Sequence, residues 1–417
     1  MKVVGVIAEY NPFHNGHQYQ LKELRRQTNA DYIVIAMSGN FLQRGVPAIA
    51  DKYIRAKMAL ENGADLVLEL PTLWSTASAE YFAHAGVTLL GGTGVISQIG
   101  YGVEQYAPVL MHSVCDLVAN SPDALSEAIM LAQKQGLSYP AARESAIKIF
   151  LPEFTAEEIH NFLSQPNNIL ALEYEKAFAD WNRQTDSSLS GFPIKRIGDG
   201  YHEADVHSNY ASATAIRKIV TEQGFKSLDV NLLPGSVYDL ICSESIAHRL
   251  VSENDFSSAL YMRLLSLQKS GYEMFADCTQ DLSCKISNEL SNFISYRQFC
   301  QRLKSKDITY TRISRVLLHI LLGITKENYT RAASHSYIAY LRVLGFRQDA
   351  TPLLSQIKRN ASLPLITKVA DAKKLLSEDA CALLEQDLYA ADLYRGIQTI
   401  HSGTESPNEF TQQIIRV

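Results

Sequence analysis

The chain has 417 residues and a formal net charge of −5, so it lacks the overall basic character of a nucleic-acid-binding protein, and any RNA contact must be local. Hydrophobic residues make up 46% and charged residues 20%, which is typical of a globular protein. The six cysteines include no CxxC pair and no Cys/His cluster with zinc-ligand spacing, which excludes the common zinc motifs.

Two further features concern location and domain number. No apolar run is long enough to span a bilayer, and the first apolar run is too short for a signal peptide. We therefore expect a cytoplasmic protein without a membrane contact. The length predicts two to three domains.

The first part of the chain alternates strand-like and helix-like segments. Residues 3–8 form a continuous apolar run, the pattern of a strand buried on both faces. Asp51 is placed to cap a helix. The alternation predicts an α/β fold with a mainly parallel sheet, which binds ligands outside the carboxyl ends of its strands. The expected strands span residues 3–8, 31–37, 65–70, 94–100 and 193–197, and the expected helices span residues 14–28, 52–61 and 79–90.

Helical periodicity dominates the rest of the chain. Residues 105–180 are mainly helical, and Thr155 with Glu158 forms a capping box. After about residue 225 the strand–helix alternation stops, and Pro234-Gly235 marks a loop. We expect a catalytic domain over residues 1–228 and a mainly helical region over residues 229–417. Short strands are expected within the second region at residues 337–344 and 363–368.

One segment carries a recognisable chemistry. Residues 9–17, EYNPFHNGH, join the first strand to the first helix. His14 and His17 are three residues apart, so they share a helix face with Leu21 and Leu24. The start of a helix offers unpaired N–H groups and a positive dipole end, which suit phosphates. Two imidazole donors there would stabilise charge on a leaving pyrophosphate. The simpler alternative is a pair of helix-start histidines without a ligand. In both cases we expect His14 to be a surface residue with little packing.

Other candidates lie at strand ends and helix starts. Gly102 is a candidate floor for an adenine or ribose pocket, or an ordinary turn glycine. Asn167 contacts a ligand or caps a helix, and Arg196 meets phosphates or lies on the surface. A small-polar segment containing Ser212, Thr214 and Arg217 enters a helix, where it would serve as a cap with a solvated arginine unless it contacts a ligand. The loop Gln43-Arg44-Gly45 is either a lid or a polar connection.

A later helix, over residues 311–324, has an apolar face and a basic one. Arg312, Arg315 and His319 form the basic face, and Arg302, Lys304 and Lys306 lie just upstream. With Tyr296 and Tyr310 nearby, this face would hold an RNA backbone and stack a base. The alternative is an ordinary solvated helix face, which is the commoner role of such charges.

The motif in residues 9–17 resembles the HxGH signature of the nucleotidyltransferase superfamily. With residues 37–45 (MSGNFLQRG) and 65–71 (DLVLELP), it resembles more narrowly the bacterial tRNA(Met) cytidine acetate ligase family. The resemblance covers most of the chain. It implies a Rossmann-like HxGH nucleotidyltransferase domain followed by a mainly helical region. It also implies a two-step reaction, in which acetate is activated by ATP as acetyl-adenylate and then transferred to the wobble cytidine of elongator tRNA(Met).

The resemblance also implies the site residues. His14 and His17 would be catalytic, and in the wider superfamily a segment like that of Ser212, Thr214 and Arg217 closes over the triphosphate. A tRNA substrate would favour RNA binding by the basic helix face, with Arg312 and Arg315 as possible tRNA-binding residues. The family often has Phe-Gly-Ser-Glu where this chain has Tyr101-Gly102-Val103-Glu104, and Val103 cannot donate a hydroxyl hydrogen bond. The implied ATP contacts are Ile7, Glu9, Tyr10, Asn11, Pro12, Phe13, His14, Asn15, Gly16, His17, Gln20, Gly102, Asn167, Arg196 and Ile197.

The partners follow from the same reading. The implied substrates are ATP, acetate and elongator tRNA(Met), and Mg²⁺ is inferred because it normally bridges ATP phosphates. The sequence shows no dedicated carboxylate cage for a metal and leaves the oligomeric state open. Two other functions compete: an adenylyltransferase for a cofactor precursor such as phosphopantetheine or a nicotinate nucleotide, and a non-catalytic RNA-binding protein. Retention of AMP on the product would favour the former, and RNA binding without ATP consumption the latter.

Overall fold

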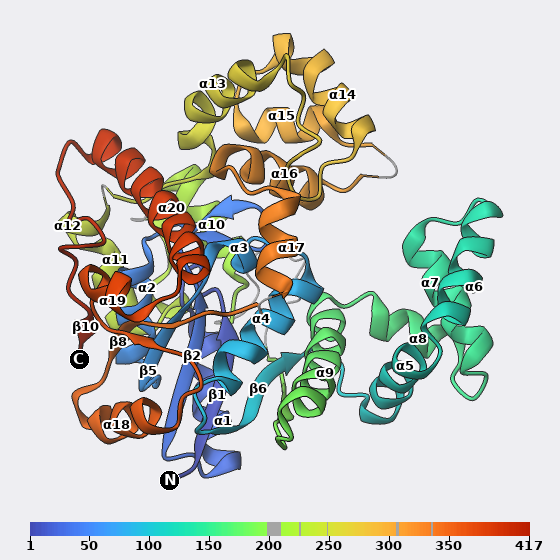
Figure 1. The fold of residues 1–417 in the computed structure, drawn as a ribbon, viewed down its shortest axis with the longest axis horizontal. Coiled ribbons are helices and arrows are strands. Elements are labelled where there is room, and N and C mark those ends of the chain that lie inside the picture. Colours follow the sequence, from blue (N-terminus) through green and yellow to red (C-terminus); the bar gives the residue numbers. More distant parts are fainter. Residues whose placement is uncertain (198–209, 225–226, 248, 306–307, 335–336) are drawn as a thin grey trace.

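The computed structural model describes residues 1–197, 210–224, 227–247, 249–305, 308–334 and 337–417 (Figure 1). In these residues, eight strands form one sheet. The adjacent strands β5, β2, β1, β6 and β7 run parallel to one another, whereas β8 runs antiparallel to β5. This confirms the prediction of a mainly parallel α/β sheet. The strands across the sheet are β10 (Ile415–Arg416), β8 (Leu341–Phe346), β5 (Leu66–Leu70), β2 (Tyr32–Ser38), β1 (Val3–Ala8), β6 (Ile96–Val103) and β7 (Ser190–Lys195), with β9 (Leu365–Ile366) beside β8.

The predicted N-terminal strands are all present, with shifts at their ends. β1 spans the predicted residues, whereas β6 starts two residues later than expected and continues to Val103. The later start follows from Gly94, which has a positive φ of 68° and lies against the backbone of Asn360. β7 begins and ends earlier than predicted, and the Arg196 N–H then donates to the Val103 carbonyl at 2.9 Å.

Both faces of the sheet are buried, which explains its continuous apolar strands. In β2, Ile33 and Ile35 point into one hydrophobic cluster, and Val34 and Ala36 point into another. Helices α1, α2, α10 and α11 contribute to the first cluster, and α4 and α9 to the second. These helices are α1 (Asn15–Thr28), α2 (Lys52–Glu61), α4 (Ala79–Gly91), α9 (Pro166–Thr185), α10 (Ala213–Gln223) and α11 (Gly235–Cys242).

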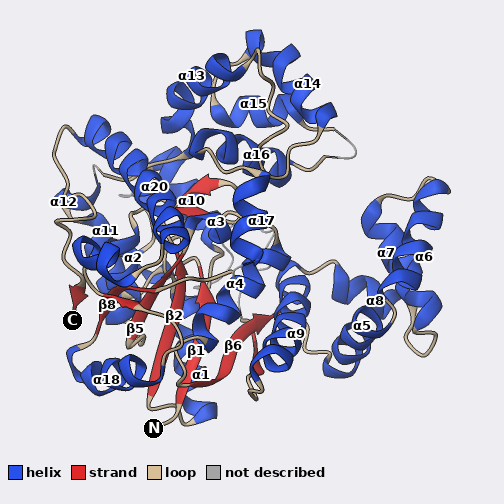
Figure 2. Cartoon of the chain, in the orientation of Figure 1, coloured by secondary structure: helices blue, strands red, loops and turns tan. Residues whose placement is uncertain are grey.

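A helical arm leaves the sheet between β6 and α9, as Figure 2 shows. Its helices pack around a separate hydrophobic cluster. Thr155 and Glu158 form the predicted capping box at the start of α8, since each side chain accepts a hydrogen bond from the other residue's backbone N–H. The arm helices are α5 (Pro108–Asn120), α6 (Pro122–Lys134), α7 (Tyr139–Phe150) and α8 (Ala156–Leu163).

The chain after residue 229 is mainly helical, as predicted, but it also returns to the sheet. The expected strands at residues 337–344 and 363–368 are β8 and β9, and β8 continues the sheet beside β5. The helices are α12 (Glu244–Ala247), α13 (Ser257–Leu267), α14 (Gln280–Glu289), α15 (Tyr296–Leu303), α16 (Tyr310–Leu322), α17 (Lys326–Ser334), α18 (Thr351–Asn360), α19 (Ala372–Leu375) and α20 (Glu378–Ser402).

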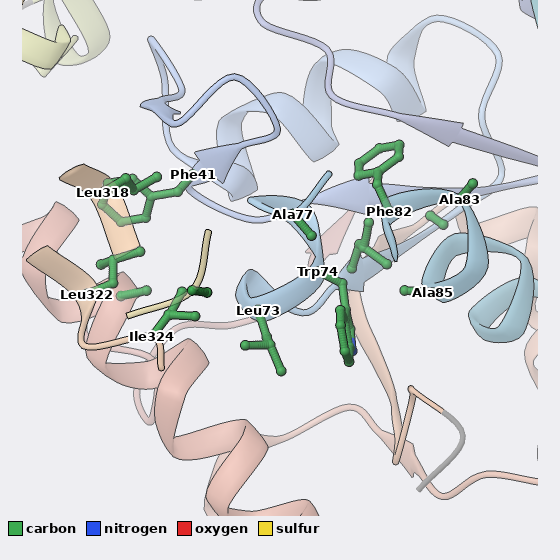
Figure 3. Packing of buried hydrophobic residues seen from close by; sticks show 14 of the residues in the cluster. Phe41, Leu73, Trp74, Ala77, Phe82, Ala83, Ala85, Leu318, Leu322 and Ile324 are labelled. Carbon is green, nitrogen blue, oxygen red and sulfur yellow. The ribbon is translucent and has the colours of Figure 1, made fainter. Parts of the chain in front are cut away.

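The helical lobe and the sheet share one hydrophobic core. Figure 3 shows members of this cluster from both parts of the chain, with Trp74 and Phe82 from one side and Leu318 and Leu322 of α16 from the other. Trp74 comes from α3 (Thr72–Ser75), which follows β5. The division into residues 1–228 and 229–417 stays a prediction, and both the sheet and this core draw residues from each side of it.

A buried network of charges joins β5 to the C-terminal strands. The Lys52 ammonium lies 2.7 Å from one Glu69 carboxylate oxygen, and the Arg342 guanidinium lies 3.0 Å from the other. Glu409 pairs with both cations. The Lys52, Glu69 and Arg342 side chains are at most 2% exposed, so the pairs replace water as the partners of these charges.

A short hairpin after β2 docks on the helical lobe. Its strands are β3 (Phe41–Leu42) and β4 (Val46–Pro47), and Gly45 lies between them with a φ of 74°. The Gly45 carbonyl accepts hydrogen bonds from the hydroxyls of Tyr296 at 3.0 Å and Ser314 at 2.8 Å. The loop of Gln43, Arg44 and Gly45 is therefore held against α16 at this glycine.

Replacing Gly45 with alanine is expected to destabilise the protein by about 2–4 kcal/mol, because the residue combines a positive φ with close packing. A Cβ atom there would lie 2.6 Å from the Cα of Arg315. Gly403→Ala is the matched control, since Gly403 has a φ of 67° with no atom within 4 Å of the added Cβ. Urea unfolding should show the larger loss for Gly45→Ala, and equal losses would contradict the close packing.

Candidate functional site

The two motif histidines stack at the start of α1. Their ring centroids are 3.7 Å apart. The His14 Nδ1 atom accepts a hydrogen bond from the Gly16 N–H at 3.1 Å, and the His17 Nδ1 atom accepts one from the His14 N–H at 3.2 Å. Because each Nδ1 is an acceptor, a neutral ring carries its proton on Nε2. The start of α1 therefore presents two adjacent Nε2–H donors.

Burial keeps both rings neutral. Burial, followed by the charges of the nearby Arg196 and Arg217, lowers the pKa of His14 to about 3. Burial also lowers the pKa of His17, with His14 and Arg196 acting in the same direction. The expectation of a surface histidine is wrong for His14, which is only 4% exposed and forms the N-cap of the helix. The His14 ring turns back over the helix start, where it accepts from the Gly16 N–H and stacks on the His17 ring.

These lowered values predict an acid sensitivity. Between its folded pKa of about 3 and its unfolded value of 6.5, His14 binds more protons in the unfolded chain, so stability rises with pH in this window. The unfolding free energy should fall by about 1 kcal/mol per buried histidine for each pH unit below about 6. Urea unfolding of the unaltered protein and His14→Asn, at about pH 7 and about pH 5.5, measures this difference.

The comparison with the variant is needed because another buried group acts in the opposite direction. Burial, followed by the charge of Glu69, raises the pKa of Asp387 to about 6, so its protonation favours the folded state over part of the same range. The same pH dependence in both proteins would show that His14 does not titrate in this way.

Helix α10 brings a second helix start and an arginine to the histidines. Ser212 caps the helix by accepting from the Ala215 N–H at 3.1 Å. Arg217 donates to the Asn11 carbonyl at 2.7 Å and to the Thr214 hydroxyl at 3.1 Å. These bonds tie the segment predicted to close over phosphates to the loop before α1. Two helix N-termini therefore meet at the carboxyl end of β1.

Gly102 makes room for the side chain of Arg196. A Cβ atom at this position would lie 3.1 Å from Cγ of Arg196 and 3.3 Å from its Cδ. The absence of a side chain on β6 thus lets the arginine lie across the strand. Val103, the next residue, is buried in the core and does not line the cleft, so a hydroxyl there would not face the same space.

One cleft gathers most of the predicted site residues. Gly16 and Ile197 line an adjoining depression that shares His14, Gln20, Gly102, Arg196 and Ser212 with it. Arg44, Arg196 and Arg217 provide guanidinium groups, so the cleft suits an anionic ligand. The predicted residues that line the cleft are Ile7, Glu9, Tyr10, Asn11, His14, His17, Gln20, Gly102, Asn167, Arg196, Ser212, Thr214 and Arg217.

Three predicted contacts lie beside the cleft rather than in its wall. Pro12 and Phe13 are buried, and the Phe13 ring packs against Tyr10 and His17. The Asn15 amide donates to the Asn231 carbonyl at 2.6 Å. These residues shape the loop and its attachment to the following helices, and their direct contact with a nucleotide stays a prediction.

Asn167 and its neighbour connect the end of β6 to α9. The Asn167 side-chain amide donates to the Glu104 carboxylate, and the Asn168 side-chain oxygen Oδ1 accepts from the Glu104 N–H at 3.1 Å. Asn168 is fully buried, whereas Asn167 lines the cleft. The structure thus separates a structural asparagine from one available to a ligand.

Several cleft residues were not predicted. Tyr101 and Tyr174 supply apolar surface to the cleft, although strand and helix periodicity marks them only as core. Arg55, which does not line the cleft, was also not predicted. It is fully buried and donates to the carbonyls of Glu9, Ser38, Gly39 and Ala50, which fixes the loops after β1 and β2. An arginine inside a helix carries no sequence signal for such a role.

Comparison with known proteins shows the family to which the chain belongs. The model of the HIGH Nucleotidyl Transferase family matches residues 1–408. A tRNA(Met) cytidine acetate ligase from Acetivibrio thermocellus is 36% identical, with 100% of both chains covered, and one from Halothermothrix orenii is 34% identical with the same coverage. The chain belongs to the tRNA(Met) cytidine acetate ligase family of HIGH nucleotidyl transferases. The predicted resemblance is confirmed.

Solved structures of this family show the same fold. The apo crystal structure of Thermotoga maritima TmcAL matches with a TM-score of 0.92, and the form bound with alpha-thio ATP matches with a TM-score of 0.88. Each is 28% identical, and each match covers 100% of both chains. The agreement includes the helical arm and the C-terminal helices, since no part of either chain is left uncovered.

The side chains predicted to form a basic face on α16 mostly contact other parts of the protein. Arg315 pairs with Asp277 at 3.0 Å, and Arg312 donates to the Asp277 carbonyl. His319 is fully buried between the carbonyls of Thr76 and Ala276, and Tyr296 is also buried, so neither offers a ring to RNA. Lys306 lies outside the described residues. RNA binding by Arg312 and Arg315 stays a prediction.

No helix in the described ranges is long and apolar enough to cross a bilayer.

Proposed function

We propose that this family member is an ATP-dependent ligase that acetylates the wobble cytidine of elongator tRNA(Met), forming N4-acetylcytidine. The observation that carries the proposal is the meeting of two neutral histidine donors, two helix N-termini and three arginines in one cleft. Its support is the family's name for proteins 34–36% identical over the whole chain, and the ATP analogue bound to a relative of the same fold. The cytoplasm, where tRNA is modified, is the proposed location.

ATP would bind with its phosphates at the start of α1. The His14 and His17 Nε2–H groups would donate to phosphate oxygens and stabilise the charge that develops as pyrophosphate leaves. Arg196 and Arg217 would neutralise the same charge, and Ser212 with Thr214 would close over the triphosphate. Gly102 and Asn167 would line the nucleoside side of the cleft.

The proposed reaction has two balanced steps. A carboxylate oxygen of acetate attacks the α-phosphorus of ATP, and the bond to the β-phosphate bridging oxygen breaks to release pyrophosphate. The exocyclic amine of cytidine then attacks the acyl carbon of acetyl-adenylate. The bond between that carbon and the phosphate oxygen breaks, AMP leaves, and the amine loses a proton. Positioning and electrostatic stabilisation supply most of the catalysis in such transfers.

Mg²⁺ would enter with ATP rather than occupy a site of its own. The described residues contain no group of three or more His, Cys, Asp or Glu side chains that could hold a metal. Among the described residues that line the cleft, Glu9 is the one carboxylate, and one of its oxygens already accepts from the Gln43 N–H at 2.9 Å. This donor set fits an ion held mainly by phosphates and water.

Exchange of labelled pyrophosphate into ATP tests the activation step. We expect exchange that requires acetate, proceeds without tRNA and stops when acetate is omitted. A cofactor adenylyltransferase would instead require its precursor and would leave AMP attached to the product. Absence of acetate-dependent exchange, both with and without tRNA, would contradict the proposed activation of acetate.

A further inference from the structure

A second groove opens next to the nucleotide cleft and shares a wall with it. The shared residues are Arg44, Val46, Thr214 and Arg217. The groove has a volume of about 350 Å³, and its lining includes residues of α10 and of the starts of α15 and α16. It therefore leads directly from the reacting centre to the helical lobe.

The groove carries an excess of positive charge. Lys218 of α10 is exposed on its wall, and Arg297 of α15 faces it from the lobe, where it pairs with Glu253 at 2.8 Å. Glu222 also lines the groove. With Arg44 and Arg217 in the shared wall, the lining has four cations against two carboxylates. This balance suits a ligand with several negative charges.

The first turn of α16 completes the groove. Thr309 caps this helix by accepting from the Arg312 N–H, and Tyr310 and Thr311 line the groove. The helix start adds a partial positive charge. Tyr310 is half-buried, so its ring packs partly against the core and also lines the groove, and an aromatic ring in such a wall is the kind of group on which a base stacks. Anionic and aromatic recognition side by side is the chemistry of single-stranded RNA binding.

The distribution of charge along the chain also favours binding of RNA on the side of the helical lobe. Residues 257–324 of the helical lobe contain nine Lys and Arg residues against five Asp and Glu residues. Residues 105–165 of the helical arm contain three against seven, so the arm repels a polyanion. An RNA that places one base in the cleft is thus attracted toward the lobe.

We propose that this groove, which we name the acceptor groove, binds the sugar–phosphate backbone next to the nucleotide that is acetylated. The inference rests on the proposed function and adds the path of the RNA. The reacting cytidine passes the shared wall of Arg44 and Arg217 into the cleft. The flanking phosphates lie against Lys218 and Arg297, and a neighbouring base stacks on Tyr310.

Equilibrium binding of elongator tRNA(Met) at several salt concentrations tests the groove. Lys218→Glu is expected to raise the Kd about tenfold and to lower the slope of log Kd against log salt by about one, since a lost phosphate contact releases one counterion fewer. Arg297→Ala should act in the same direction. Lys269→Glu, which reverses an exposed cation elsewhere in the lobe, is the matched control and should change the Kd less than about twofold.

Other outcomes would contradict the proposal that the acceptor groove binds RNA. An unchanged Kd and salt slope in both groove variants would do so. Weaker binding in Arg312→Ala alone would place the RNA on the Asp277 side of α16 instead. A loss of pyrophosphate exchange equal to the loss of tRNA acetylation would show that the variants act on ATP and not on RNA. Because tRNA binding is measured without turnover, these results are separate from a failure of acetate activation, which the unaltered protein would show.

Discussion

His14→Asn is expected to lower acetate-dependent pyrophosphate exchange by about 100- to 1,000-fold, the usual effect of removing one donor from a site of developing charge. Asparagine is chosen because its side-chain oxygen can still accept from the Gly16 N–H and cap α1. The substitution removes the Nε2–H group and the stacking partner of His17 while the helix start is kept. The measurement is the exchange rate at saturating ATP and acetate.

A histidine elsewhere provides the control for this variant. His112 of α5 is 78% exposed and pairs only with Asp116 of the same helix among the described ion pairs. His112→Asn should leave the exchange rate within about twofold, because surface substitutions rarely disturb a fold. An exchange rate of His14→Asn close to that of the unaltered protein would remove this ring from the mechanism.

Arg342→Met is expected to destabilise the protein by about 3–5 kcal/mol, because Lys52 alone would then face two buried carboxylates. Glu69 and Glu409 would each lose the contact with the guanidinium and would share Lys52. The affected strand, β8, attaches the C-terminal part of the chain to the sheet. Urea unfolding, followed by circular dichroism, measures the change.

Arg347→Met is the matched control, since its side chain is 39% exposed and pairs with the exposed Asp349. Its loss should be below about 1 kcal/mol, as for other surface ion pairs. Similar losses in the two variants would show that the buried network contributes no more than a surface pair.

Local patterns predicted the first half of the fold well. The apolar run of β1 and the cap at Asp51 are properties of short segments, and the structure keeps both. A strand was expected near β8, but its place in the sheet was not predicted, because its partner β5 lies more than 270 residues away and runs antiparallel. The burial of Arg342 in this strand was also not predicted, since a buried charge can be recognised only when its distant partners are known.

The residues of the candidate site were predicted one segment at a time, but their arrangement in space was not predicted. His14, Gly102, Arg196 and Arg217 come from four segments, and the parallel sheet brings them to one edge. The burial of His14 was missed because its inward turn depends on a hydrogen bond to Gly16. The misreading of His319 has a similar cause: helix periodicity placed it among cations, whereas its actual neighbours are the carbonyls of Thr76 and Ala276.

Transfer of labelled acetate to RNA tests the central claim most directly. The unaltered protein is incubated with ATP, labelled acetate and a transcript of elongator tRNA(Met), beside a transcript in which the wobble cytidine is replaced by uridine. We expect label in the first RNA only, as N4-acetylcytidine, with one AMP and one pyrophosphate released for each acetyl group. Equal labelling of both transcripts, or release of AMP and pyrophosphate without labelled RNA, would contradict the proposed function.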